Sequence, residues 1–297
     1  MTVVDIHTHL FWYPDHIDEQ TATESLASKL VKLEQSGGRA HLSSRDLHSN
    51  DARPEGHLEA TKAADRVVVF GLYAPQTGFS VPNHVIADYV RRHPDRMEGW
   101  ASINPADDDA LEQLEHCVED LGLRGVKLGP AYQHWDPRDT SLWPFFERVE
   151  KLDLPVMIHQ ATTYPTRARI EWAKPLQLEP LVMAFPDMRM ILAHMGHPWE
   201  EDAIALVRKA PQVYTDISAL HFRPWRFWQA MVTAMEYGIS HKILFGSDFP
   251  NASTADTLDG LRRVNDIVEG TRFPRFPDDA QERIVHENWK RFLGEDW

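Results

Sequence analysis

The stretch VVDIHTH, residues 3–9, combines the pattern of a buried β-strand with two side chains that commonly bind metal ions. His7 and His9 lie two residues apart, so on a strand both side chains face the same side and can hold one ion. Taken alone, a His-x-His motif is weak evidence in a chain with 16 histidines, because it can be incidental. The stretch therefore predicts the first strand of the fold, and other strands must show whether its histidines belong to a site.

Seven later apolar runs repeat this strand pattern, and each is followed by a turn and a segment with helical period. We expect buried parallel strands at residues 66–71, 99–103, 125–128, 155–159, 190–194, 213–217 and 243–248. The clearest helix is expected at residues 107–121, where Asp107 can cap the start and Gly122 supplies the stop. From the fourth strand on, landmark residues recur about every 30 positions, the length of one βα unit.

Eight such units that close on themselves make a barrel, so the sequence predicts an α/β fold, a distorted (β/α)8 TIM barrel in one domain over residues 1–297. A doubly wound sheet is the alternative, but its first strand would be followed by a glycine-rich phosphate loop, which is missing here. The first βα connection is long, and its polar segment 36–54 is expected to form a lid or binding loop. Additional C-terminal helices are expected at residues 254–269 and 278–293, outside the barrel.

Composition limits the classes of partner. The chain has 297 residues and a formal net charge of -14, which repels nucleic acid and anionic membrane surfaces. Its one cysteine, Cys117, excludes a disulfide framework and cysteine-ligated metal sites within one chain. No long apolar run or signal-peptide pattern is present. We expect a cytoplasmic protein with a small-molecule substrate, no nucleic-acid or membrane partner, and a homodimer as an open alternative.

Further metal-type residues lie where other predicted strands end. His159 ends the fifth strand, His194 ends the sixth and Asp248 ends the eighth. In a barrel these ends converge on one mouth. Buried histidines and a carboxylate from distant segments are costly in a core unless a cation satisfies them, so the sequence favours a metal site over a structural core.

Five stretches resemble the amidohydrolase superfamily, in the metal-dependent branch that includes aminocarboxymuconate-semialdehyde decarboxylase-like proteins. They are DIHTH at 5–9, GVKLGP at 125–130, MIH at 157–159, AHMGHPW at 193–199 and FGSDFP at 245–250. The resemblance implies one divalent ion, usually zinc, held by residues that match His7, His9, His159 and Asp248. It also implies that His194 is the acid–base residue beside the metal.

These implied roles agree with elementary chemistry. A divalent cation with an open position lowers the pKa of bound water toward about 7. Asp248 can coordinate the cation and hold that water, and His194 can give or take protons as a catalytic residue. The alternatives for His194 are a further metal ligand or a satisfied core histidine. Nitrogen and oxygen ligands also admit manganese or cobalt.

Lys127 leaves the number of metal ions open. In two-metal members of the superfamily, a carbamylated lysine on the fourth strand bridges the ions. An inward Lys127 must be ion-paired, carbamylated or hydrogen-bonded, because an unpaired buried ammonium is costly. It could therefore bridge a second metal or bind a substrate carboxylate, and a side chain that points outward is the remaining alternative.

Other candidates lie in the predicted loops. Asp5 shares a side of the strand with His7 and is expected to orient a ligand histidine, or else to form a buried salt bridge. Substrate contacts are predicted from the loops at Arg45, Tyr132, His134, Tyr164, His221 and Arg223. Arginine, histidine and aromatic side chains suit a carboxylated, ring-containing substrate.

Two reactions fit these residues. The favoured one is metal-dependent hydrolysis of an amide, lactone or similar C–N or C–O bond by activated water. The alternative is zinc-dependent, non-oxidative decarboxylation of a small aromatic or unsaturated acid, with His194 as proton donor. A catalytically inactive barrel that only binds a ligand is the third reading, and the presence of all five metal-site residues argues against it.

Overall fold

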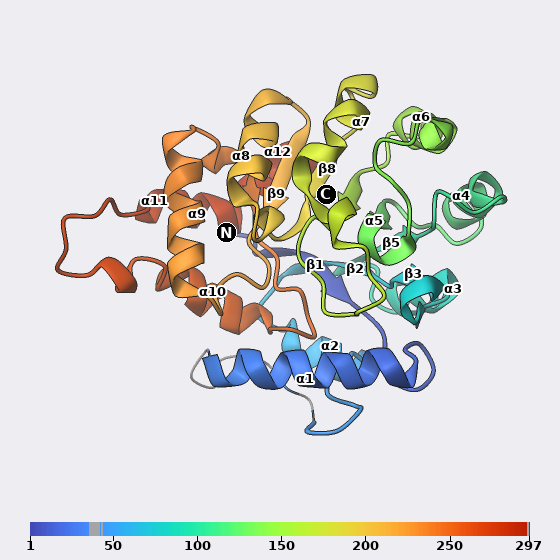
Figure 1. The fold of residues 1–297 in the computed structure, drawn as a ribbon, viewed down its shortest axis with the longest axis horizontal. Helices are drawn as coiled ribbons and strands as arrows, with labels where there is room; N and C mark the ends of the chain where they lie inside the picture. Colours follow the sequence, from blue (N-terminus) through green and yellow to red (C-terminus); the bar gives the residue numbers. More distant parts are fainter. Residues whose placement is uncertain (36–41, 43, 296) are drawn as a thin grey trace.

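The computed structural model describes residues 1–35, 42, 44–295 and 297. Eight parallel strands form one sheet that curls into a nearly closed barrel, as the sequence predicts (Figure 1). In sheet order they are β1 (Val4–His9), β2 (Arg66–Phe70), β5 (Met97–Ser102), β6 (Val126–Leu128), β7 (Val156–Ile158), β8 (Met190–Leu192), β9 (Val213–Asp216) and β10 (Ile243–Leu244). A separate two-stranded hairpin consists of β3 (Tyr73–Ala74) and β4 (Phe79–Ser80).

The barrel closes through the chain that follows β10. The ladder of β10 covers only Ile243 and Leu244, shorter than the strand expected at 243–248. Beyond it, the amide of Asp248 donates to the carbonyl of His7 at 2.8 Å, and the amide of His9 donates to that of Phe249 at 2.9 Å. The two ends of the sheet are thus joined at the point where β1 carries its histidines.

Helices surround the strands in the order of the chain (Figure 1). Their bounds are α1 (Glu19–Gln35), α2 (Pro54–Ala60), α3 (Asn83–Val90), α4 (Ala110–Glu119), α5 (Pro130–Gln133), α6 (Trp143–Lys151), α7 (Glu179–Ala184), α8 (Glu200–Lys209), α9 (Pro224–Glu236), α10 (Thr254–Arg262), α11 (Asp278–His286) and α12 (Asn288–Leu293). Within the described residues, none of these helices has both the length and the apolar composition needed to cross a membrane.

Side chains alternate between two apolar layers along the strands. On β2, Val68 and Phe70 belong to the cluster inside the barrel, whereas Val67 and Val69 belong to the larger cluster under the helices. Both faces are buried, which explains the continuous apolar runs in the sequence. Trp289 and Phe292 of α12 join the inner cluster, so the C-terminal helix packs against the interior of the barrel.

Three expected helix boundaries are wrong. The helix expected from Asp107 begins at Ala110, and no side chain caps it. The segment expected as one helix at 254–269 ends its α-helical part at Arg262 and continues as a short 3-10 turn, Asp266–Val268. The helix expected at 278–293 is divided at Glu287, where the backbone leaves the helical region.

The long first connection is not a simple loop. It contains the 17-residue helix α1, which the sequence analysis did not predict. Its buried side chains are Thr21, Ala22, Ser25 and Lys29, so it lacks the apolar stripe by which amphipathic helices are recognised. Of the segment expected as a lid, 36–54, residues 36–41 and 43 lie outside the described residues.

Helix α1 lies across the mouth of the barrel at the carboxyl ends of the strands. Arg167, in the loop after β7, forms an ion pair with Asp18 just before α1. Farther along the helix, the Lys29 ammonium donates to the carbonyl of Pro250, after β10, at 2.7 Å. Figure 1 shows α1, in blue, along one edge of the molecule beside α2. The helix therefore joins loops from opposite parts of the mouth.

Candidate metal centre

His7, His9 and Asp248 form a compact group of possible metal ligands. His7 Nε2 and His9 Nε2 each lie 3.3 Å from Asp248 Oδ1, and all three side chains are buried. Ligand atoms about 2.0–2.1 Å from a tetrahedral ion lie about 3.3–3.4 Å from one another. The spacing and the nitrogen and oxygen donors therefore fit a divalent cation.

The position of this group depends on a close approach of two backbones. Gly246 precedes Asp248 by two residues, and a Cβ atom placed on it would lie 2.8 Å from His7 Cβ. Any side chain there would push β1 away from the segment that carries Asp248. The glycine in the FGSD stretch is thus needed for β1 and the segment that carries Asp248 to meet.

Asp216, at the end of β9, orients His7 and was missed by the sequence analysis. Its Oδ2 lies 2.9 Å from His7 Nδ1, and its Oδ1 accepts from the backbone amides of His194 and Ser218, each at 3.0 Å. The Ser218 hydroxyl adds a third bond to Oδ1 at 2.5 Å. With Nδ1 held by a carboxylate, the lone pair of His7 Nε2 is directed toward Asp248.

The pKa values of the buried candidate ligands depend on one another's charges. Burial is the largest influence on the pKa of Asp248 and raises it, but His194, His7 and His9 together hold that pKa well below its usual range. Burial and Lys127 lower the pKa of His7, whereas Asp216 and Asp248 outweigh them and raise it. Burial lowers the pKa of His9 to about 3, so His9 is a neutral ring with a lone pair available.

His194 lies beside this group in a conformation that few residues adopt, with φ of 59°. Its Nδ1 is 3.1 Å from the carbonyl oxygen of Ser218 and 2.7 Å from the Ser218 hydroxyl. A carbonyl can only accept, so it favours the tautomer with the proton on Nδ1 and leaves Nε2 basic. Burial lowers the pKa of His194 to about 4.

His159 contacts His194 but lies outside the compact group. Its Nδ1 is 3.2 Å from His194 Nε2, and its ring packs edge-on against Tyr132. His159 Nε2 is buried, with no hydrogen-bond partner among the described residues. Its role as a metal ligand stays a prediction.

Lys127 points into the barrel and is 1% exposed. Its Nζ lies 3.3 Å from His7 Nε2 and 4.8 Å from the centre of the Phe70 ring. Burial lowers the pKa of Lys127 to about 8, although Asp248 and Asp216 oppose this shift. No carboxylate of the described chain lies within ion-pair distance of it. The outward alternative is therefore wrong, and the choice between bridging ligand and substrate contact stays open.

Asp5 supports the site in a different way from the one expected. Its Oδ1 accepts from the backbone amide of Ser247 at 2.9 Å, and its Oδ2 accepts from the Thr254 hydroxyl at 2.6 Å. Within the part of the chain that the structure describes, it contacts no histidine ring and no cationic side chain, and its contact with His7 is to the backbone amide, at 3.4 Å. Asp5 therefore holds the segment before Asp248 in place, whereas Asp216 orients His7.

The predicted substrate contacts are spread over several places. Tyr132 is buried beside His159, and Tyr164 lies 3.4 Å from the Asn50 amide nitrogen. His134 Nε2 contacts the carbonyl of Arg167 at 2.8 Å, and Arg45 is exposed. These contacts place the two tyrosines near the mouth, and the guanidinium of Arg223 donates to the carbonyl of Ala219, in the loop after β9, at 3.2 Å.

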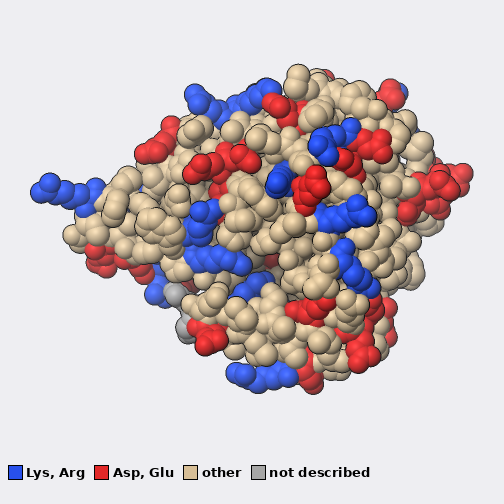
Figure 2. All heavy atoms as spheres, in the orientation of Figure 1, with Lys and Arg blue, Asp and Glu red and all other residues tan. Residues whose placement is uncertain are grey.

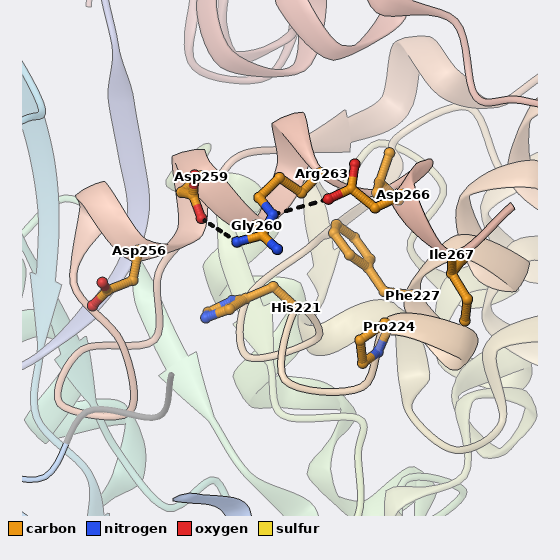
Figure 3. Close-up of a pocket in the computed structure, with 10 residues that line it drawn as sticks. His221, Pro224, Phe227, Asp256, Asp259, Gly260, Arg263, Asp266 and Ile267 are labelled. Atoms are coloured by element: carbon orange, nitrogen blue, oxygen red, sulfur yellow. Dashed lines mark hydrogen bonds and ion pairs between the residues drawn. The ribbon is translucent and has the colours of Figure 1, made fainter. Parts of the chain in front are cut away.

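His221 lies in a different cavity, of about 290 Å3, between the loop after β9 and α10. Figure 3 shows its ring beside Gly260 and Asp256, while Arg263 bridges Asp259 and Asp266. A Cβ on Gly260 would lie 2.4 Å from His221 Cβ, so α10 packs directly on this residue. The residues that line this cavity do not include His7, His9 or Asp248, so the structure does not bring His221 to the metal group.

Two enzymes are among the known proteins whose sequences resemble this chain. Gamma-resorcylate decarboxylase of Rhizobium radiobacter is 31% identical over 140 residues, which is 38% of this chain and 43% of that relative, so the chain spans less than half of its length. The 2-keto-4-carboxy-3-hexenedioate hydratase of Sphingobium sp. is 24% identical over 91% of both chains.

Among solved structures, an uncharacterized TIM-barrel protein from Bordetella bronchiseptica has a TM-score of 0.74 and 20% identity. The matched region covers 99% of this chain and 98% of the Bordetella protein. This likeness shows the barrel fold. The family model described as Amidohydrolase matches residues 4–294, and the chain therefore belongs to the amidohydrolase family.

Proposed function

We propose that this protein is a divalent-metal-dependent enzyme that decarboxylates a small carboxylic acid. The observation that carries the proposal is the buried group of His7, His9 and Asp248, which offers a cation position beside the Lys127 ammonium. With a divalent ion bound, the positive charges would outweigh those of Asp248 and Asp216, so the site would attract a carboxylate and stabilise the negative charge that moves onto the rest of the substrate when CO2 leaves. The relationship to gamma-resorcylate decarboxylase supports the same reaction.

We assign the ion to His7, His9 and Asp248, with His159 as a further ligand because its buried Nε2 has no partner among the described residues. When bound, a zinc or manganese ion supplies a positive charge that polarises a substrate oxygen. One ion is favoured over two, because the Lys127 ammonium already lies 3.3 Å from His7 Nε2.

His194 is proposed to move the proton. Decarboxylation breaks the bond to the carboxyl carbon, leaves the electron pair on the neighbouring carbon and needs one proton there. Ser218 holds Nδ1 of His194, so the proton is taken up and delivered by Nε2, which faces His159 Nδ1 at 3.2 Å and becomes accessible when that contact opens. The side chain is 6% exposed, which leaves a route for exchange with solvent.

Hydrolysis of a lactone or amide is the second candidate, and the state of His194 favours it. Burial lowers the pKa of this residue to about 4, so its Nε2 is a neutral base at pH 7 that can accept a proton from water. The sequence favours hydrolysis over decarboxylation, whereas the similarity to gamma-resorcylate decarboxylase favours decarboxylation.

The two reactions are separated by their products. Protein loaded with zinc or manganese would be incubated with gamma-resorcylate and related carboxylated aromatics, and the released CO2 measured. The lactone 2-pyrone-4,6-dicarboxylate would be tested in parallel by the loss of its ring absorbance. We expect CO2 release that stops on chelation and in His194→Ala but persists in the surface control Lys62→Met. Ring opening without CO2 from any acid, or CO2 release that survives chelation, would overturn the proposal.

A further inference from the structure

The face of α1 that lies over the mouth is polar rather than apolar. Thr21, Ser25 and Lys29 are buried along it. The Lys29 ammonium donates to the carbonyls of Pro250 at 2.7 Å and Ser49 at 3.0 Å. The buried Ser25 hydroxyl on the same face lies beside the phenol of Tyr164 and lowers its pKa, against the larger effect of burial. A helix that brings such a face to a mouth is suited to contact a polar ligand.

Lys32 extends this face by one turn and reaches toward the metal group. Its Nζ lies 3.4 Å from the side-chain oxygen of Asn251. The amide nitrogen of the same Asn251 donates to Asp248 Oδ2 at 2.8 Å. One amide side chain therefore separates the Lys32 ammonium from a proposed metal ligand.

Arg223 lies against the same end of α1. Leu33, the neighbour of Lys32, packs against Phe222 and Ala219 in one small cluster. The guanidinium of Arg223 donates to the Ala219 carbonyl at 3.2 Å. The two cations therefore come from separate elements that meet at the rim of the mouth.

Neither cation has an acidic partner within ion-pair distance in the described residues. Among the described residues, the side chain of Lys32 donates to an amide oxygen and that of Arg223 to a carbonyl, and neither contacts a carboxylate. Glu200 is the acid whose charge acts on Arg223, but its two oxygens are already bound by His197 and Arg226. Two half-buried positive charges without a counter-ion are unfavourable unless an anion joins them. Figure 2 shows Lys and Arg side chains at the rim of a hollow beside α1.

We propose that Lys32 and Arg223 bind a second carboxylate of the substrate, separate from the group held at His7, His9 and Asp248, so that the substrate is a small dicarboxylic acid. This inference rests on the proposed function, because it describes the same mouth. It assigns α1 a direct role in substrate selection. Each cation can donate a charge-assisted hydrogen bond, and arginine can bind both oxygens of a carboxylate at once.

The test compares two inert probes, benzoate and benzene-1,3-dicarboxylate, on the metal-loaded full chain by calorimetric titration. We expect the dicarboxylate to bind about tenfold more tightly or better, as is typical of one hydrogen bond to a charged group. Lys32→Met and Arg223→Gln should each abolish this advantage and leave benzoate binding unchanged. Lys62→Met is the matched control, because this exposed lysine of the first connection is paired with Glu59.

Melting temperatures of the variants near that of the wild type would show that α1 remains in place. Equal binding of the two acids, no binding of either at millimolar concentration, or an advantage that survives both substitutions would overturn the inference. The outcome is independent of turnover. A preference for the dicarboxylate with no CO2 from any acid would refute the proposed reaction and leave the subsite standing, and CO2 release without such a preference would do the opposite.

Discussion

Replacing Asp216 by Asn should damage metal binding while leaving the fold intact. Asp216 Oδ1 accepts three bonds, from the amides of His194 and Ser218 and from the Ser218 hydroxyl, and an Asn oxygen can accept all three. The Asn NH2 group must then take the place of Oδ2, which lies 2.9 Å from His7 Nδ1. A donor there forces His7 to carry its proton on Nε2, the atom that faces Asp248.

The expected loss of metal affinity follows from this geometry. The ligand lone pair of His7 is replaced by an N–H group, so the ion loses one donor unless the ring changes tautomer. Loss of a partner that orients a ligand typically lowers metal affinity 10–100-fold, which is about 1.4–2.8 kcal/mol. We expect the loss of affinity in Asp216→Asn to lie at the upper end of this range, because the substitution reverses the tautomer of His7 and does not merely loosen the hold on its ring.

The assay is a competition for zinc against a chromophoric chelator. Asp5→Asn is the matched control, since Asp5 is an equally buried carboxylate whose partners are Ser247, Thr254 and the amide of His7. The Thr254 hydroxyl can rotate to accept from the new NH2 group, so the control should bind zinc nearly as the wild type does. Unchanged zinc affinity in Asp216→Asn, or an equal loss in both variants, would refute the role given to Asp216.

Three further outcomes are expected. His194→Ala should retain its metal while turnover collapses, and elemental analysis alongside a product assay checks both; metal lost together with activity would make His194 a ligand. Lys127→Met should leave the number of ions per chain unchanged, and a fall in that number would reveal a bridging lysine. Burial and the charge of Arg223 lower the pKa of Lys32 to about 8, although the charge of Asp248 opposes this shift. The preference for the dicarboxylate probe should therefore decline as the pH rises through about 8. Because deprotonation removes the charge, the preference is full below this pH; a preference independent of pH would exclude Lys32.

The barrel could be predicted because its strands are buried on both faces. Continuous apolar runs such as 66–71 can be recognised in a single sequence, without an alignment. Their C-terminal ends then placed His7, His9 and Asp248 at one mouth, and the structure brings these three together. The approach of β1 to the segment after β10 depends on Gly246, whose role a single sequence does not reveal.

Helix α1 could not be predicted in this way. Its buried face consists mainly of Thr21, Ser25 and Lys29, so hydrophobic periodicity gives no signal. The helix is held by the pairing of Lys29 with two carbonyls and by the ion pair of Asp18 with Arg167, contacts that join distant loops. Such long-range polar contacts leave no local pattern.

Asp216 was missed for a related reason. It is a single aspartate at the end of the run 213–217, and nothing near it in the sequence links it to His7. Its position at the end of a buried strand, equivalent to those that placed His159 and His194, is the signal that could have found it. Orienting residues of this kind are recognised from geometry, because their partners lie far away along the chain.

The proposal on which the others depend is one divalent ion held where β1 meets the segment after β10. It is tested by the metal content per chain of protein prepared without added metal and then titrated with zinc or manganese. We expect one ion per chain, and its loss when Asp248 is replaced by Asn. Uptake of neither metal would refute the metal site, and two ions per chain would refute a single-ion site and make Lys127 a bridging ligand.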